Sequence, residues 1–286
     1  MLAPFQASYN GLQMGAGSDV QIVEIDGLRQ MPQLRQGDVA KAQRNGSFPG
    51  LNLLDERVVT ITLQVGVTVQ PFISVLNQVS AAFQNIENPS GGLPFQFMFA
   101  EWADPLQIIG RPTKVGFPVD SAYQAHLVEI PVEFTCPDPL IYDSQQQMVS
   151  TGLPQSGVGL SFPVTFPASF GTATGGLMSA SNAGKYTTFP TFYITGPCTN
   201  PKLTLSSTGQ FLQVNVALLA GQWLSCDMAN QVVMLQGTSL RNNALAVGSS
   251  WFGFNPGANT VAFSSSDSAQ VSPNCVAMWS NAWGWV

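Results

Sequence analysis

The chain contains few residues that could perform acid–base or nucleophilic chemistry. It has a single histidine, His126, whereas a Ser-His-Asp or Cys-His site needs a histidine as its base. The alternation of residues 123–136 places His126 on the apolar face of a predicted strand, where we expect a packed, hydrogen-bonded side chain. The phosphate-binding loop, GxGxxG, HExxH and EF-hand patterns are all missing. The sequence therefore offers no motif for nucleophilic, nucleotide-dependent or zinc-dependent catalysis.

The carboxylates do not form a convincing catalytic pair either. A glycosidase needs two carboxylates at a defined separation, and beyond residue 150 the chain has only Asp227 and Asp267. Both lie in turn-like contexts, and Asp227 is expected to shape a corner by bonding to nearby backbone. Glu129 and Glu133 project from one face of a predicted strand, where solvation is the ordinary explanation. We predict that the protein is not an enzyme and uses no cofactor and no metal.

Four cysteines are spread along the chain: Cys136, Cys198, Cys226 and Cys275. They form no CxxC pair, and the N-terminus MLAPFQASYNG does not resemble a signal peptide. We therefore expect buried free thiols in a protein assembled in the cytosol, rather than disulfides or metal ligands.

The tryptophans raise the question of ligand stacking. Trp223, Trp251 and Trp279 fall in strand-like runs and are predicted to be core residues. Trp283 and Trp285 lie near the end of the sequence, where exposure or contact with a neighbouring protein is expected. Exposed tryptophans can serve as platforms for sugars, so sugar binding stays open.

Charge is scarce and uneven. Charged residues make up 9% of the chain, against about a quarter in ordinary soluble proteins. The first 150 residues hold 14 acidic and 7 basic side chains and the rest 2 and 3, so no basic patch for nucleic acid is expected. Either the surface is rich in Ser, Thr, Asn and Gln, or neighbouring copies cover it, and we favour the second. No apolar run approaches the ~18 residues of a membrane span.

Periodicity in the first half predicts antiparallel strands and one helix. Apolar residues alternate strictly from Val59 to Val69, which is typical of a half-buried strand. Pro71 is suited to a first helical position, and an apolar stripe continues to Ile86, so a helix is predicted over residues 71–86. Further strands are expected at Val20–Ile25, Leu28–Leu34, Pro94–Glu101, Gln107–Phe117 and Tyr123–Cys136, with Pro131 implying an edge or a bulge. Residues 37–50 are expected to form a polar loop.

The second half predicts a β-sandwich. Short runs rich in β-branched and aromatic residues, separated by Gly, Pro, Asn and Ser, are typical of that architecture. They are Thr191–Thr195, Lys202–Ser206, Phe211–Leu218 and Val232–Leu235. Residues 155–188 read as a strand entry and long loops, and the composition shift near residue 148 predicts domains at 1–148 and 149–286.

The order of several short motifs resembles the distal tail protein family of long-tailed phages. In the second half these are Phe189-Pro190-Thr191-Phe192 before Gly196-Pro197, then Asn200-Pro201, Gly221-Gln222-Trp223-Leu224 with Asp227, Asn255-Pro256-Gly257-Ala258-Asn259, and Val276-Ala277-Met278-Trp279-Ser280. In the first half they are Asp26-Gly27-Leu28, Arg57 and Cys136-Pro137-Asp138-Pro139. Their spacing, rather than any single motif, carries the resemblance.

The resemblance implies a mainly all-β protein with one helix. Its N-terminal split β-barrel would form a hexameric ring, and its C-terminal sandwich would be galectin-like or carbohydrate-module-like. The ring would connect the tail tube to the baseplate or tail tip hub in the virion, after assembly in the host cytoplasm. Expected partners are five further copies, the tail tube protein and the tail hub protein, with the tape measure and receptor-binding proteins as additional candidates; DNA would pass through the lumen without specific binding.

Five residues are interface candidates on this interpretation. Arg44 and Phe48 lie in the predicted polar loop, Arg57 precedes the clearest strand, and Trp283 and Trp285 lie near the end. Two alternatives stay open: a carbohydrate-binding β-sandwich adhesin, which needs exposed tryptophans and glycan affinity, and another tail component such as a tube or hub protein.

Overall fold

The computed structural model describes residues 2–66, 71–84, 92–154, 175–267 and 272–285. The predicted strand and helix ends at Val67, Val69 and Ile86, and most of the predicted loops of residues 155–188, lie outside these ranges. The chain forms two compact units, Met1–Gln145 with Trp283–Val286, and Gln146–Ala282. Unlike the division expected near residue 148, the last four residues belong to the first unit.

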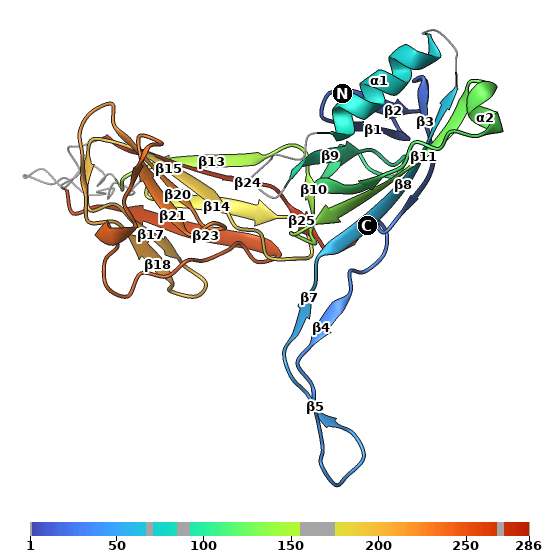
Figure 1. Cartoon of the computed structure of the whole chain (residues 1–286). Helices are drawn as coiled ribbons and strands as arrows, with labels where there is room; N and C mark the ends of the chain where they lie inside the picture. The colour runs from blue at the N-terminus through green and yellow to red at the C-terminus, as the bar shows by residue number, and fades with distance from the viewer. Residues whose placement is uncertain (1, 67–70, 85–91, 155–174, 268–271, 286) are drawn as a thin grey trace, which may run out of the picture. The chain divides into compact units, whose positions relative to one another are not determined.

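The first unit is built mainly from antiparallel strands (Figure 1). Its elements are β1 (Gln6–Tyr9), β2 (Leu12–Gly15), β3 (Val20–Asp26), β4 (Leu34–Gln36), β5 (Val39–Ala40), β6 (Ser47–Phe48), β7 (Asn52–Leu54), β8 (Arg57–Gly66), α1 (Phe72–Phe83), β9 (Leu93–Phe97), β10 (Leu106–Val115), α2 (Ser121–Gln124), β11 (Leu127–Cys136) and β12 (Ile141–Asp143). The main sheet runs β2-β1-β9-β10-β11-β8-β3, and β12 pairs with β10 and with β25 (Ala282–Trp283).

Strand β8 confirms the predicted alternation. Val59, Ile61, Leu63 and Val65 are buried, because every second side chain of a strand faces the same side. Strand β11 pairs with β8 along its whole length, from Leu127 opposite Gly66 to Cys136 opposite Arg57. The last residue pair between β10 and β11 is Val115 with Val132, so the adjacent Pro131 pairs only with β8. This edge-like position suits proline, which has no N–H to donate to a second strand.

The predicted helix is confirmed as α1. Its buried stripe, Phe72, Val75, Leu76, Val79, Ala82 and Phe83, has the spacing of one helical face. Phe83 stacks on Tyr9 with ring centroids 5.4 Å apart and meets the edge of Phe134 at 5.8 Å. The helix therefore belongs to the apolar core of the first unit.

The strand predicted at Leu28–Leu34 is wrong, and so is the loop predicted at residues 37–50. Residues 28–33 form no strand, and residues 34–54 form a projecting hairpin, which we call the arm. Its strand β4 pairs with β7, and β5 pairs with β6 nearer the tip. Figure 1 shows the arm standing away from the main sheet of its own unit.

The second unit consists of two larger sheets around a second core. Its elements are β13 (Gln147–Gly152), β14 (Leu177–Asn182), β15 (Thr191–Thr195), β16 (Cys198–Thr199), β17 (Lys202–Leu205), β18 (Phe211–Gln213), β19 (Ala217–Leu218), β20 (Trp223–Asp227), β21 (Val232–Leu235), β22 (Ser239–Leu240), the 3₁₀ helix η1 (Asn242–Ala244), β23 (Gly257–Ser264) and β24 (Asn274–Trp279). One sheet runs β13-β24-β15-β20-β21-β22 and the other β14-β23-β17-β18. Their inward side chains form one apolar cluster.

Three of the four strands predicted for this unit are confirmed closely, as β15, β17 and β21. The fourth, Phe211–Leu218, is divided. Its first part, β18, pairs with β17, and its last part, β19, pairs with β16 in a separate small sheet. Between them Val214 bridges to Leu245, which interrupts the continuous strand that the apolar run suggested.

Candidate functional site

The histidine does not occupy the position expected from periodicity. His126 precedes β11 with φ of 60°, and its backbone N–H donates to the carbonyl of Tyr123 in a turn. Its side chain is exposed, and its ring lies 5.3 Å from that of Phe72. The predicted burial is therefore wrong, because the short helix α2 shifts the start of the strand. Within the described ranges no group of three or more His, Cys, Asp or Glu residues could hold a metal ion.

The cysteines are free and buried, as predicted. Burial raises the pKa of the Cys136 and Cys226 thiols to about 12 and that of Cys198 to about 11. It also raises the pKa of Cys275 well above its ordinary value. Since the thiolate is the reactive form, these four cysteines stay protonated and unreactive at neutral pH.

The two carboxylates of the second unit serve local structure. Asp227 accepts backbone N–H groups from Ala229 at 3.0 Å and Asn230 at 2.9 Å, which confirms the predicted corner. Asp267 accepts from the backbone N–H of Thr199 and from the hydroxyl of Ser265. The backbone hydrogen bond from Thr199 lowers the pKa of Asp267.

The tryptophans of the second unit differ from one another. Trp279 is a core residue, as predicted, and meets Phe254 edge-on at 5.4 Å. Trp251 is partly buried and packs against the same core. Trp223 was predicted to be buried but lies half-buried on the opposite face of β20 from the buried Leu224. There its ring lies 5.9 Å from that of Tyr193, tilted by 46°.

The arm carries apolar side chains that no core covers. Leu51 is 73% exposed, Val39 64% and Phe48 61%. Leu34 and Leu53 are also exposed on the β4–β7 ribbon. A two-stranded ribbon is only marginally stable by itself, and exposed apolar surface of this kind marks interaction sites. The arm is therefore the strongest candidate for binding another protein chain.

The tip of the arm is basic. Lys41 and Arg44 lie within the loop between β5 and β6, and the Lys41 ammonium lies 5.4 Å from the centre of the Phe48 ring. Asp38 accepts the backbone N–H of Gly50 at 2.8 Å. In the part of the chain that the structure describes, the exposed Arg44 side chain has no hydrogen-bond or ion-pair partner. Two predicted interface residues, Arg44 and Phe48, are thus both exposed at the tip end of the arm, Arg44 in the loop and Phe48 in β6.

Arg57 has a different environment from the one predicted. Its side chain is 1% exposed, so a direct contact with another chain is not supported. Its guanidinium donates to backbone carbonyls at Pro139 (2.8 Å), Gly27 (2.6 Å), Gln30 (3.0 Å), Leu28 (3.3 Å) and Gly284. Burial lowers the pKa of Arg57 from its ordinary value, yet arginine stays charged in proteins. The residue therefore links three segments: residues 27–30 before the arm, the connection between β11 and β12, and the C-terminal segment.

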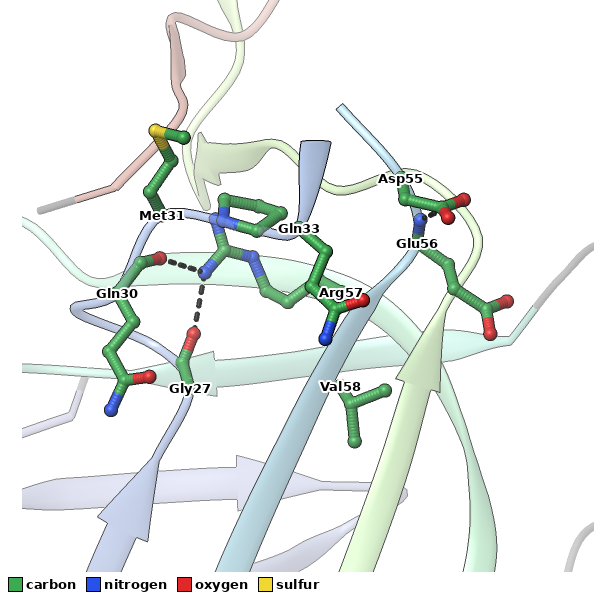
Figure 2. Close-up of a pocket in the computed structure, with 9 residues that line it drawn as sticks. Gly27, Gln30, Met31, Gln33, Asp55, Glu56, Arg57 and Val58 are labelled. Atoms are coloured by element: carbon green, nitrogen blue, oxygen red, sulfur yellow. Dashed lines mark hydrogen bonds between the residues drawn. The ribbon is translucent and has the colours of Figure 1, made fainter. Parts of the chain in front are cut away.

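A cavity of about 280 Å³ lies beside Arg57 where the arm begins, and we call it the root pocket. It is lined by Gly27, Gln30, Met31, Pro32, Gln33, Asp55, Glu56, Arg57 and Val58. Figure 2 shows Asp55 and Glu56 on one side, Gln30 and Met31 on the other, and Arg57 between them. Sequence reasoning missed this pocket, because its walls, residues 27–33 and 55–58, lie on either side of the arm and are far apart in the sequence.

The two C-terminal tryptophans differ in exposure. Trp283 is half-buried and meets Trp102 edge-on, with ring centroids 5.2 Å apart. Trp285 is 47% exposed. Trp285 is therefore the more exposed of the two residues. Among the described helices, none is long and apolar enough to cross a membrane.

Comparison with known proteins relates part of the chain to a described family. Residues 183–283 match the family described as Siphovirus-type tail component, C-terminal domain. No curated protein sequence matches the chain. The structure is similar to that of the Dit protein (gp 19.1) of phage SPP1, described as a paradigm of the hub adsorption apparatus in phages infecting Gram-positive hosts; the TM-score is 0.63 at 14% identity, covering 96% of this chain and 97% of that one.

Two further solved structures are similar over most of their length. They are chains of the phage P2 baseplate in its activated conformation, one with Ca and one with Sr. The first has a TM-score of 0.54 at 9% identity and covers 94% of this chain and 93% of that one. The second has a TM-score of 0.51 at 8% identity and covers 91% of each chain.

The family match covers most of the second unit, and the fold similarity extends through both units. The fold is mainly β with few helices and several antiparallel sheets, as in the SPP1 protein. Residues 183–283 thus form a domain of the siphovirus-type tail component family, and the fold of the chain is similar to that of the SPP1 Dit protein.

Proposed function

We propose that this protein forms a hexameric ring that connects the tail tube to the baseplate or tail tip hub. The observation that supports it best is the arm. Its exposed apolar side chains, among them Phe48 and Leu51, have no core of their own to cover them. A second copy of the chain is a suitable binding partner, since most homo-oligomers are closed symmetric assemblies built from repeated contacts.

The two units would have different roles in the ring. The first would be a split β-barrel that carries the ring contacts. This architecture is supported by the main sheet, because its two edge strands, β2 and β3, contact each other and so bring the ends of the sheet together. The second would be a galectin-like sandwich that holds peripheral tip proteins, with receptor-binding and tape measure proteins as further candidate partners. On this proposal the protein acts by geometry in the virion, without catalysis, after assembly in the host cytoplasm.

Negative-stain imaging of the purified full chain tests the ring. We expect particles with six-fold symmetry and a central opening. A population of single chains at every concentration, with intact secondary structure by circular dichroism, contradicts self-association through this protein alone.

A second candidate function is carbohydrate binding by the second unit. Tyr193 and Trp223 form an aromatic pair on the outward face of β15 and β20, and Tyr193 is 38% exposed. The hydroxyl side chains of Thr191, Thr195 and Ser225 lie on the same face. Quenching of tryptophan fluorescence by a neutral oligosaccharide, lost in Trp223→Ala, would favour this adhesin-like function.

A further inference from the structure

The root pocket presents carboxylates that have no cationic partner in the part of the chain described. Asp55 accepts the backbone N–H of Glu56 at 3.0 Å, and the Glu56 side chain is exposed. Arg57 also lines the pocket, but its donors are directed to backbone carbonyls. Asp26, which accepts from Gln30, adds a further negative charge nearby. The pocket therefore keeps a net negative character despite the buried arginine.

The arm tip has the complementary chemistry. Arg44 is exposed, and Lys41 lies in the same loop between β5 and β6. Asp38, the nearest acid along the arm, already accepts the Gly50 backbone N–H and approaches the Ser47 hydroxyl at 3.4 Å. The tip is thus a small basic surface with an apolar neighbour, Phe48.

The tip of a given chain cannot reach its own root pocket. The β4–β7 and β5–β6 pairings keep the two halves of the arm side by side and hold the tip away from its base (Figure 1). At ~3.3 Å per residue the arm extends on the order of 30 Å from root to tip. A tip that enters a root pocket must therefore come from another copy.

We propose that Arg44 at the tip of one copy's arm docks into the root pocket of the neighbouring copy, against the carboxylates of Asp55 and Glu56. This inference rests on the proposed ring and assigns one of its contacts. An arginine can bond two carboxylate oxygens at once, which gives both strength and orientation. The cavity of about 280 Å³ is smaller than sites for drug-sized ligands, which begin near ~300 Å³, and it suits a single long side chain.

The contact is heterologous, because the tip of one copy meets the root of the next. A heterologous contact closes into a ring when its rotation returns to the first copy, and otherwise produces a filament. One tip-to-root contact per copy is therefore compatible with a closed ring.

Charge reversal in the full-length chain tests the contact by light scattering. We expect Arg44→Glu and Glu56→Arg each to weaken ring formation at least tenfold, because each places like charges together. The double variant R44E/E56R should restore the ring mass. Mixing the two single variants should also restore it. In an alternating ring of the two variants, each reversed tip meets a reversed pocket, and each unchanged Arg44 tip meets a pocket with Glu56 unchanged.

Matched controls are Lys185→Glu in the second unit and Glu129→Arg on the outward face of β11, both exposed charge reversals. They should leave the ring mass unchanged. Folding of each variant is checked by circular dichroism. Rings that persist in both Arg44→Glu and Glu56→Arg, or folded single variants that neither the double variant nor mixing rescues, overturn this contact while leaving the proposed ring standing. A wild-type chain that stays monomeric removes the ring and the contact together.

Discussion

Arg57 shows how one buried cation can hold distant segments together. Its five carbonyl acceptors lie at residues 27–30, at Pro139 and at Gly284. The fork of the guanidinium can serve several acceptors in different directions, whereas a lysine ammonium is a single point of charge. The residue therefore has a structural role in the first unit that its position before a strand did not reveal.

Replacing Arg57 by Met should destabilise the first unit by roughly 2–5 kcal/mol, because several buried carbonyls lose their donor. Arg57→Lys should recover only part of that loss. The free energy of unfolding in urea is the measurement, with the exposed Arg111→Met as the control. A loss below about 1 kcal/mol for Arg57→Met would show that water or neighbouring groups replace the guanidinium.

The buried thiols predict how stability depends on pH. In the folded chain the pKa of Cys136 and Cys226 is raised to about 12, against about 8.5 in an unfolded chain. Above pH ~8.5 the unfolded state loses thiol protons that the folded state keeps, so stability is full below that pH and falls as pH approaches 12. Urea midpoints at pH 7, 9 and 10.5 should decrease in that order.

A variant without two of these thiols, Cys136→Ala with Cys226→Ala, should show a flatter decrease over the same pH range. Burial also raises the pKa of Tyr9 to about 12, so a residual slope is expected. Midpoints that stay constant or rise between pH 9 and 10.5 in the wild-type chain are incompatible with the thiols being buried.

At the scale of elements, we predict that the arm is needed for assembly but not for folding. Its side chains contribute to neither apolar core, so the main sheet should fold without it. We expect replacement of residues 35–53 by an Asn-Gly turn to leave the melting temperature within a few degrees of the wild-type value and to abolish ring formation.

Two results would count against that assignment. Rings formed by the armless chain would place the ring contacts elsewhere, and a loss of cooperative melting would show that the arm supports its own unit. A control that replaces the exposed Leu240 in the second unit by Ser should affect neither property.

The elements that the sequence predicts well are those with long, regular periodicity. Strand β8 alternates over many residues and α1 carries a continuous stripe, so local pattern and final burial agree. Strand β15 was found at its predicted bounds, because it is a short β-rich run ended by Gly196-Pro197. In each case the information needed lies within the segment itself.

The features that were missed depend on residues far away in the sequence, or on which face of a strand a side chain occupies. The arm strands are two or three residues long and pair only with each other, so they show no buried alternation. Trp223 was assigned to the core from its apolar character, although the alternation with Leu224 and Cys226 places it on the outer face. The burial of Arg57 could not be predicted, because its acceptors are spread from Gly27 to Gly284.

At the scale of the whole molecule, the proposed ring would account for the unusual composition. Only 9% of residues are charged, and a freely dispersed protein with so few charges is poorly protected against association. In a ring, part of this weakly charged surface would be buried against neighbouring copies. The excess of acidic over basic side chains in the first 150 residues leaves the basic arm tip as a distinct local feature.

The solution mass of the purified full-length chain, measured by light scattering over a range of concentrations, tests the central claim most directly. The chain mass is 30.5 kDa, so a closed ring of six copies should give about 183 kDa and keep that mass on dilution. A mass of 30.5 kDa at every concentration, from a sample with a cooperative melting transition, would contradict the proposal that this protein assembles its ring through its own surfaces.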